Sequence, residues 1–463
     1  SYFQAASPDA RAQAHWGAAA SPHAQTMLSG TRTLAQRARW SARNDPRAAA
    51  IVENLVSSIV GSGLKALPSA NNERWKRVAG ETFERWTDEA DFFGRSDFYG
   101  VQAQVVRSVI EAGEAFVRLR TRPLGEADTI PLRLEAVDPD LCPTDLNRDL
   151  PGGARIVGGI EIDADGRRRA YHLYRRHPGD GAIGSIETTR VPAEEMLHIF
   201  KPLTAGQVRG VSWLAPVLKR LAELDGFDDA TLTRARVSSL LTAFIETDGE
   251  VGPLDEVTDA SGDINLGSGN VVDLAPGERV KFSEPPNFSP NYEEFVRSQL
   301  RAIASGVGLS YEQLSGDLTG VNFSSLRAAI VEFRRRVEAW QHHIVVFQLC
   351  RPVWREWVRL GVASGRLPQP AGFRRDASPY LTARWLPAAQ AWLDPAKDSA
   401  AKRDLLAAGL TSRSELAAEL GIDVEELDAE IAADQARADR LGLRFSFDAR
   451  APEPDPENEE TGQ

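Results

Sequence analysis

Apolar residues in the first part of the chain recur every three or four positions. This spacing predicts amphipathic helices over residues 28–60, 71–89 and 97–112. The segment Asn44-Asp45-Pro46 is typical of a helix start, because a side-chain oxygen caps the free amides and proline fits the first turn. Gly113 follows the third pattern and is expected to end it.

Beyond Gly113 the apolar pattern changes to the short runs of β-strands. The predicted strands cover residues 115–120, 132–137, 156–162, 169–174 and 196–200. Between two of them, Asp163-Ala164-Asp165-Gly166 predicts a hairpin turn. These four residues are also similar to the start of a calcium loop. The rest of the twelve-residue ligand set does not follow, so the hairpin is the favoured interpretation.

A long helical pattern covers residues 212–242, and about 30 helical residues would span about 45 Å. The next segment, residues 243–290, is rich in glycine, proline and aspartate, with strand-like pieces at 270–274 and 279–282. Helical character returns over residues 291–305. An irregular insert of this length between two helices favours a functional or protruding part over a compact core.

The remaining sequence predicts further helices. A loop over residues 306–322 precedes a strong helical pattern from Phe323 to Leu360. Residues 394–442 predict three short helices, broken at Gly409 and Gly421. The whole order predicts an α+β chain with an extended projecting part.

Composition narrows the possible functions. The chain has 463 residues, of which 42% are hydrophobic and 26% charged, as in a folded protein. The net charge of −12 disfavours wrapping of DNA, since proteins that grip phosphates are usually basic. Two cysteines, Cys142 and Cys350, are too few for a disulfide framework and fit a reducing cytoplasm. The sequence predicts no membrane span and no secretion signal.

Common catalytic signatures are missing from the sequence. It contains no GxxxxGK[ST] loop, HExxH, GxSxG or complete GxGxxG motif, so we expect neither an enzyme nor a cofactor. His342 and His343 are adjacent in a helical pattern and should point apart, which disfavours joint metal binding. A hydrolase whose site is assembled from distant residues stays open as a third hypothesis.

One segment supports a different function. Residues 411–426 are similar to the first half of a helix-turn-helix, and a DNA-binding regulator using residues 411–430 is the runner-up hypothesis. The second helix would begin near Val424 and carries Glu425, Glu426, Asp428 and Glu430. These carboxylates would repel phosphates, so a local helix pair is favoured.

Four blocks of sequence, in a fixed order, carry a resemblance to a known family. The blocks are Arg39–Asp45 continuing through Asn54–Val56 to Ile59–Gly63; Gly113–Arg118; Val191–His198 with Gly206–Pro216; and Asp394–Asp398 with Gly409–Arg413 and Gly421–Asp423. Through this series the chain resembles the lambda-type family of phage portal proteins.

The resemblance implies a structural protein of the virion, assembled in the host cytoplasm. Such subunits form a closed ring, usually a dodecamer, at one vertex of a capsid built from a major capsid protein. Double-stranded DNA passes through the ring during packaging and ejection. A terminase docks during packaging, and a head-completion or adaptor protein replaces it later. The source could equally be a virus, a prophage or a gene transfer particle.

The resemblance also implies a subunit with a mixed α/β wing, a long helical stem, a small β-containing clip and a helical C-terminal crown. The corresponding ranges are wing 1–210, stem helix 211–242, clip 243–290, returning stem helix 291–307, tunnel loop and wing helix 308–380, crown 381–450, and a disordered acidic tail 451–463.

Two groups of residues are candidates to face DNA. The tunnel-loop candidates are Ser315, Gly316, Asp317, Leu318, Thr319, Gly320, Val321 and Asn322. The polar face of the stem helix offers Asp225, Asp228, Asp229, Arg234 and Arg236. Asp317 is the only charged residue of the loop and would repel phosphate. A net acidic subunit suits a conduit, because many phosphate contacts would stop DNA from sliding.

Overall fold

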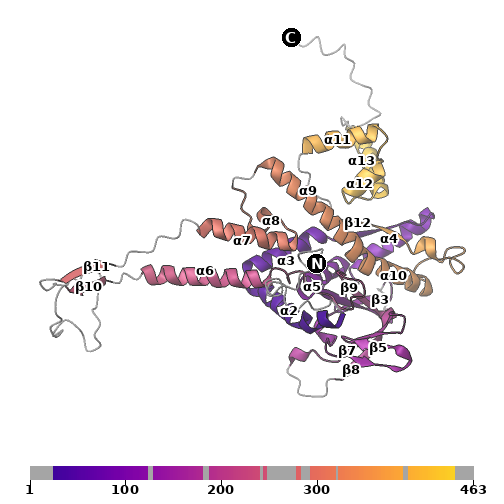
Figure 1. The fold of residues 1–463 in the computed structure, drawn as a ribbon. Coiled ribbons are helices and arrows are strands. Elements are labelled where there is room, and N and C mark those ends of the chain that lie inside the picture. Colours follow the sequence, from indigo (N-terminus) through magenta and orange to yellow (C-terminus); the bar gives the residue numbers. More distant parts are fainter. Residues whose placement is uncertain are drawn as a thin grey trace, which may run out of the picture.

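A globular body carries two projecting parts (Figure 1). Helices α6 (Leu218–Ser239) and α7 (Tyr292–Val307) leave the body side by side, and the strands β10 and β11 lie beyond their far ends. A small group of helices, α11 to α13, lies on another side. The computed structural model describes residues 24–123, 129–180, 187–239, 243–247, 278–282, 292–319, 322–388 and 395–443.

The predicted N-terminal helices are confirmed. They are α2 (Ala24–Asn44), α3 (Pro46–Ile59), α4 (Glu73–Thr87) and α5 (Phe98–Ala112). Asp45 separates the first two, and its side chain accepts a hydrogen bond from the Arg47 amide. Gly113 ends α5 with a φ of 96°, a conformation that favours glycine.

Two antiparallel sheets form the β part of the body. The three-stranded sheet has the order β3-β2-β9, with β2 (Glu114–Thr121) in the centre between β3 (Leu132–Val137) and β9 (Met196–Phe200). The five-stranded sheet runs in sequence order from β4 to β8. Its strands are Arg148–Asp149, Arg155–Val157, Ile160–Ile162, Arg168–Tyr174 and Thr188–Pro192.

The single strand expected over residues 156–162 is wrong. Gly158 and Gly159 both have positive φ values, 55° and 79°, and turn the chain between β5 and β6. The hairpin expected at Asp163–Gly166 is confirmed, because β6 and β7 pair across it and the Asp163 amide donates to the Arg167 carbonyl at 2.9 Å.

An aromatic core joins helices from the two halves of the chain. Phe83 and Trp86 of α4 lie against Trp354 and Trp357 of α10 (Arg351–Ala363), with the ring centroids of Phe83 and Trp354 5.1 Å apart. Trp86, Trp354 and Trp357 are all buried. The Trp86 indole donates to the Leu132 carbonyl at 2.9 Å, so the same core holds the edge of the three-stranded sheet.

One continuous helical run crosses the body. It consists of α9 (Phe323–Trp340), a π-helical stretch η6 (Gln341–Cys350) and α10, which confirms the helix expected from Phe323 to Leu360. Pro352 follows the π-helical stretch and has no amide hydrogen to donate to Gln348, so regular α-helical bonding cannot continue unbroken there.

The C-terminal part contains the three expected short helices. They are α11 (Pro395–Ala407), α12 (Arg413–Glu419) and α13 (Val424–Leu441), and Gly409 and Gly421 have the positive φ values of helix ends. Before them, β12 (Ala383–Leu386) pairs with β1 (Lys65–Pro68). No helix in the described part of the chain is long and apolar enough to cross a membrane.

Candidate functional site

The projecting helices form a stem whose apolar residues are covered only at its base. Leu221 and Leu224 of α6 are buried where the stem joins the body. Further along, Phe227 is 40% exposed and Leu232 is 58% exposed, and Phe295 of α7 is 45% exposed. Since such side chains gain free energy when covered, the outer stem offers a surface for another chain.

The base of the stem is fixed to the body by polar contacts. Asp228 of α6 forms an ion pair with Arg47 of α3 and accepts a hydrogen bond of 2.9 Å from the Tyr292 hydroxyl of α7. The bond to Asp228 raises the pKa of Tyr292. Arg220 donates to the Gln299 amide oxygen at 3.0 Å, which joins the two stem helices again. The stem therefore leaves the body at a defined angle.

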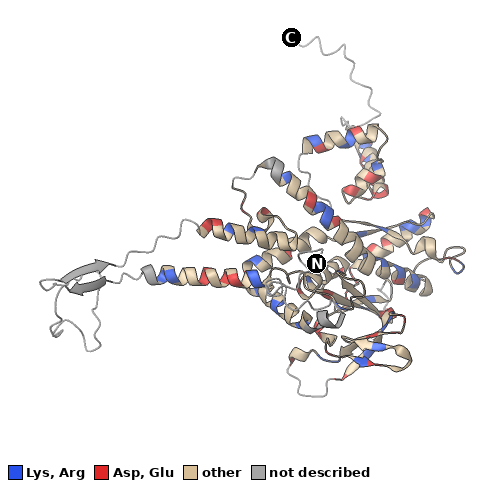
Figure 2. Cartoon of the chain, viewed as in Figure 1, with Lys and Arg blue, Asp and Glu red and all other residues tan. Residues whose placement is uncertain are grey.

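The long stem helix begins later than expected. The pattern predicts helix from residue 212, but α6 begins at Leu218, because residues 213–217 form turns around Pro216. Its predicted polar face is only partly solvated. Asp228 is half-buried and bonded to the body, whereas the other four candidates are exposed: Asp225, Asp229, Arg234 and Arg236. In Figure 2 the middle of α6 is red and the part nearer the ribbon is blue, so acidic and basic residues lie in separate bands. That this face meets DNA stays a prediction.

Beyond the stem, strands β10 (Ala243–Thr247) and β11 (Glu278–Phe282) pair antiparallel, with Thr247 opposite Glu278. The strand expected at 279–282 is thus confirmed, and its partner was not expected. The strand-like piece at 270–274 lies outside the described residues. The insert consequently carries a two-stranded ribbon at the far end of the stem (Figure 1).

The loop expected over residues 306–322 contains a helix, α8 (Tyr311–Ser315), so that expectation is wrong in part. Ser310 and Gln313 form a capping box at its start, each side chain bonding the other residue's amide. Gly316 ends the helix with a φ of 68°. Of the tunnel-loop candidates, Ser315 is therefore helical, whereas Gly320 and Val321 lie outside the described residues.

Asp317 turns back onto its own loop and the stem. It accepts hydrogen bonds from the Thr319 amide at 3.0 Å and the Tyr311 hydroxyl at 2.9 Å. The Arg297 guanidinium of α7 lies 3.5 Å from the same carboxylate. The bonds from Thr319, then that from Tyr311, lower the pKa of Asp317 to about 2. This carboxylate stays charged near neutral pH and holds the loop against α7.

A buried ionic cluster that the sequence pattern did not predict lies in the β part of the body. One carboxylate oxygen of Glu114 lies 2.5 Å from the guanidinium of Arg209, and the other lies 2.9 Å from the Nε2 atom of His198. Arg209 also donates to the carbonyls of Gly158 and Cys142. The only hint in the sequence is a glutamate at the start of an apolar strand. Because Arg209 bonds both Glu114 of β2 and the Gly158 carbonyl between β5 and β6, the cluster holds the two sheets together.

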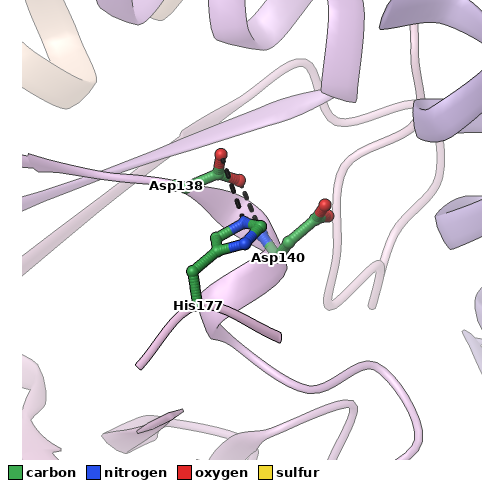
Figure 3. Close-up of side chains that lie close together, drawn as sticks. All are labelled: Asp138, Asp140 and His177. Atoms are coloured by element: carbon green, nitrogen blue, oxygen red, sulfur yellow. Dashed lines mark hydrogen bonds and ion pairs between the residues drawn. The ribbon is translucent and has the colours of Figure 1, made fainter. Parts of the chain in front are cut away.

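Three side chains with metal-binding atoms, Asp138, Asp140 and His177, also lie close together (Figure 3). Arg39 of α2 contacts both carboxylates, at 2.8 Å from Asp138 and 2.7 Å from Asp140. The guanidinium already supplies the positive charge that a cation would bring, so this group is an ion-pair network.

The helix pair of the runner-up hypothesis consists of α12 and α13. The first turn of α13 carries Glu425 and Glu426, and Glu425 pairs with Lys76 of α4 at 2.7 Å. Arg413 of α12 pairs with Asp428 of α13. An acidic helix bound to the body in this way has the wrong charge to approach DNA phosphates.

The model of the family described as "Phage portal protein, lambda family" matches residues 9–341 of this chain. This chain belongs to the lambda family of phage portal proteins. The match covers much of the body, the stem and the segment that contains α8, so the family resemblance seen in the sequence is confirmed.

Other members of the family match over long stretches. The chain is 30% identical over 432 residues to a "Probable portal protein" of Halomonas phage phiHAP-1, a match that covers 89% of this chain and 81% of that protein. It is 24% identical to the "Portal protein B" of Escherichia phage lambda, covering 62% of this chain. The match spans 59% of the lambda protein.

Solved structures align with this chain at low sequence identity. One chain from the "Neck of native GTA particle computed with C12 symmetry" aligns over 87% of this chain and 95% of its own length, with 16% identity and a TM-score of 0.46. The crystal structure of an HK97 family phage portal protein from Corynebacterium diphtheriae aligns over 63% of this chain and 84% of its own length, with 11% identity and a TM-score of 0.31.

Proposed function

We propose that this portal protein assembles into a closed ring at one capsid vertex, through which double-stranded DNA is packaged and ejected. Membership of the portal family carries the proposal. The exposed apolar side chains of the stem, Phe227, Leu232 and Phe295, support it, because neighbouring copies in a ring would cover them. Twelve subunits is the number that the family resemblance implies.

The ribbon, the loop after α8 and the outer body each have a proposed role in this ring. The β10–β11 ribbon is the clip, where a terminase docks during packaging and a head-completion protein docks later. The loop after α8 faces the channel, and the outer body contacts the major capsid protein. The chain itself has a structural role with no hydrolysis and no cofactor. The site of action is the virion, after assembly in the host cytoplasm.

Ring formation is tested on the purified full-length protein by native mass measurement and negative-stain microscopy. We expect closed rings from the wild type. Leu232→Glu with Phe295→Glu should give folded monomers, because charges on the stem would be buried between copies. Phe93→Glu is the control, since Phe93 is 52% exposed and lies in the segment between α4 and α5 of the body. A wild type that stays monomeric, or stem variants that form normal rings, would contradict the proposal.

A further inference from the structure

A group of positive charges lies on α10 and the loop that follows it. Residues 351–375 contain six arginines and one glutamate, in a chain whose net charge is −12. We define the arginine patch as the exposed arginines of this region that have no carboxylate partner, together with two exposed arginines of α4. Its members are Arg355, Arg366, Arg374, Arg375, Arg74 and Arg77.

The backbone of the patch is held by buried neighbours. Arg355 follows Trp354, whose indole donates to the Tyr380 carbonyl at 3.2 Å. The Tyr380 ring contacts Trp75, the neighbour of Arg74, at 4.9 Å between centroids, and Phe373, the neighbour of Arg374, at 5.8 Å. These contacts bring α4, α10 and the loop to one place, with arginines at its rim.

Two exposed arginines in and just after β7 have carboxylate partners, unlike those of the patch. Arg169 lies 2.8 Å from Asp163, and Arg175 lies 3.4 Å from Glu187. Among the residues that the structure describes, no carboxylate lies within 4.0 Å of a patch guanidinium, and Glu356 pairs instead with Arg359 at 3.7 Å. The patch therefore keeps positive charge for an external anion.

The position of the patch indicates which anion it meets. It lies at the end of the molecule opposite the β10–β11 ribbon (Figures 1 and 2). Arg355 is roughly 30 residues beyond Phe323 on the continuous helix, on the order of 45 Å from the loop after α8. Such a site is away from the proposed channel contact, so phosphate binding there would not hinder sliding through the channel.

We propose that the arginine patch binds the phosphate backbone of double-stranded DNA held inside the capsid. The proposal rests on the proposed function: because the ribbon docks the terminase outside the capsid, the opposite end of the subunit lies on the side of the packaged DNA. Exposed guanidiniums suit phosphate oxygens, to which they donate paired hydrogen bonds. Binding of this kind is independent of base sequence and weakens with salt.

The test uses full-length protein and a fluorescent duplex of random sequence, with affinity measured by anisotropy over a range of salt concentrations. We expect Arg374→Gln with Arg375→Gln to weaken binding about tenfold or more at about 50 mM salt. The slope of log affinity against log salt should fall by about 1 for each phosphate that the variant no longer neutralises. The matched control is Arg169→Gln with Arg175→Gln, which removes the same charge from two exposed, paired arginines.

An unchanged affinity and salt slope in the patch variant would overturn the proposal, as would an equal loss of affinity in the control. If the variant keeps wild-type affinity for the duplex but is no longer incorporated into capsids, the patch binds a protein and the DNA proposal fails. Microscopy of the same samples keeps the two proposals distinguishable: absence of rings contradicts the proposed function, whereas rings with unchanged DNA binding contradict only the patch.

Discussion

At the scale of single residues, Glu114 holds together parts of the chain that are far apart in sequence. Its carboxylate meets His198 from 84 residues away and Arg209 from 95 residues away. Burial raises the pKa of Glu114, but the charge of Arg209 and the hydrogen bond from His198 outweigh it, and the pKa falls to about 2. Burial lowers the pKa of His198 to about 4, so this ring stays neutral near pH 7.

These shifts predict a loss of stability in mild acid. In the unfolded chain His198 binds a proton near pH 6.5, whereas in the folded protein it does so only near pH 4. The unfolded state therefore binds more protons in this window, and the free energy of unfolding should fall as the pH drops from about 6.5 toward 4. Thermal unfolding at several pH values measures the effect.

His198→Gln serves as the matched variant, because glutamine can still donate to Glu114 but does not titrate. Its unfolding temperature should depend less on pH between 6.5 and 4 than that of the wild type. A variant with the same pH dependence would show that another group is responsible. The contribution of Glu114 lies lower, between its ordinary value near 4.5 and about 2, so the two are separable.

The sequence could not predict this cluster, because charged residues on separate strands reveal no partner until the strands pair. Glu114 and Arg209 lie within blocks that resemble the portal family, but in the sequence each could equally have been a solvated side chain. The exposure of Asp225 and Asp229 on the stem was easier to predict, since helical periodicity places both on the polar face, and both are exposed. The contact of Asp228 with the body could not be predicted, because its partner Arg47 is 181 residues away in the sequence.

At the scale of elements, side-chain contacts hold the described start of the loop after α8, residues 316–319. Asp317 links it to Tyr311 of α8 and to Arg297 of α7, so its conformation depends on the returning stem helix. Asp317 therefore has two roles in this loop: it attaches the loop to α7 and α8, and it gives the loop its negative charge. Any substitution at Asp317 changes the loop's attachment as well as its charge.

We predict that Asp317→Lys slows DNA packaging several-fold, most clearly at low salt, where screening is weak. In a ring the change is repeated in every subunit and places attractive charge around the channel. Asp317→Asn separates the two effects, because it removes the charge but keeps an oxygen that can accept the Thr319 bonds. DNA content per particle is the measurement, with rings checked separately. Equal packaging by Asp317→Lys and wild type at low salt would show that the loop does not meet DNA.

The ribbon of β10 and β11 allows a sharp test of the clip. Thr247 lies opposite Glu278, so an Asn-Gly turn can replace residues 248–277 without changing the strand register. We expect the shortened protein to remain soluble and form rings but to lose binding of the terminase, measured by co-sedimentation. Insolubility would mean that the insert belongs to the core, and unchanged terminase binding would place the docking site elsewhere.

Periodicity predicted the long elements well and their interruptions poorly. The helix from Phe323 continues to Ala363, slightly beyond the expected end, because the apolar spacing is sustained. The short helix α8 was missed, although Ser310 and Gln313 have the spacing of a capping box. The pairing of β1 with β12 joins residues more than 300 positions apart, and no local pattern encodes it.

At the scale of the whole molecule, the group α11–α13 is attached to the body through exposed ion pairs. Lys76 lies 2.7 Å from Glu425, Arg384 lies 3.3 Å from Glu415, and Arg327 lies 3.3 Å from Asp398. The buried residues within its helices are few and small: Ala417, Ala418 and Ala438. Exposed pairs contribute roughly 0.2–1 kcal/mol each, so this attachment is weak and sensitive to salt.

We predict that raising salt from about 0.05 to 1 M increases amide hydrogen exchange in α11–α13 several-fold while α5 in the core is unaffected. Lys76→Gln should produce part of the same increase at low salt, because it removes the ion pair with Glu425. Exchange that does not respond to salt or to this variant would mean that apolar contacts, rather than ion pairs, attach these helices.

The continuous run of α9, η6 and α10 has a mechanical consequence. Its 41 residues, from Phe323 to Ala363, make a rod on the order of 55–60 Å long. One end adjoins the loop after α8, and the other is seated in the tryptophan core beside Arg355. If the run tilts as one body, a tilt of about 5° moves one end by about 5 Å relative to the other. If DNA displaces the loop after α8 in the proposed channel, the rod would carry that displacement to the far side of the subunit.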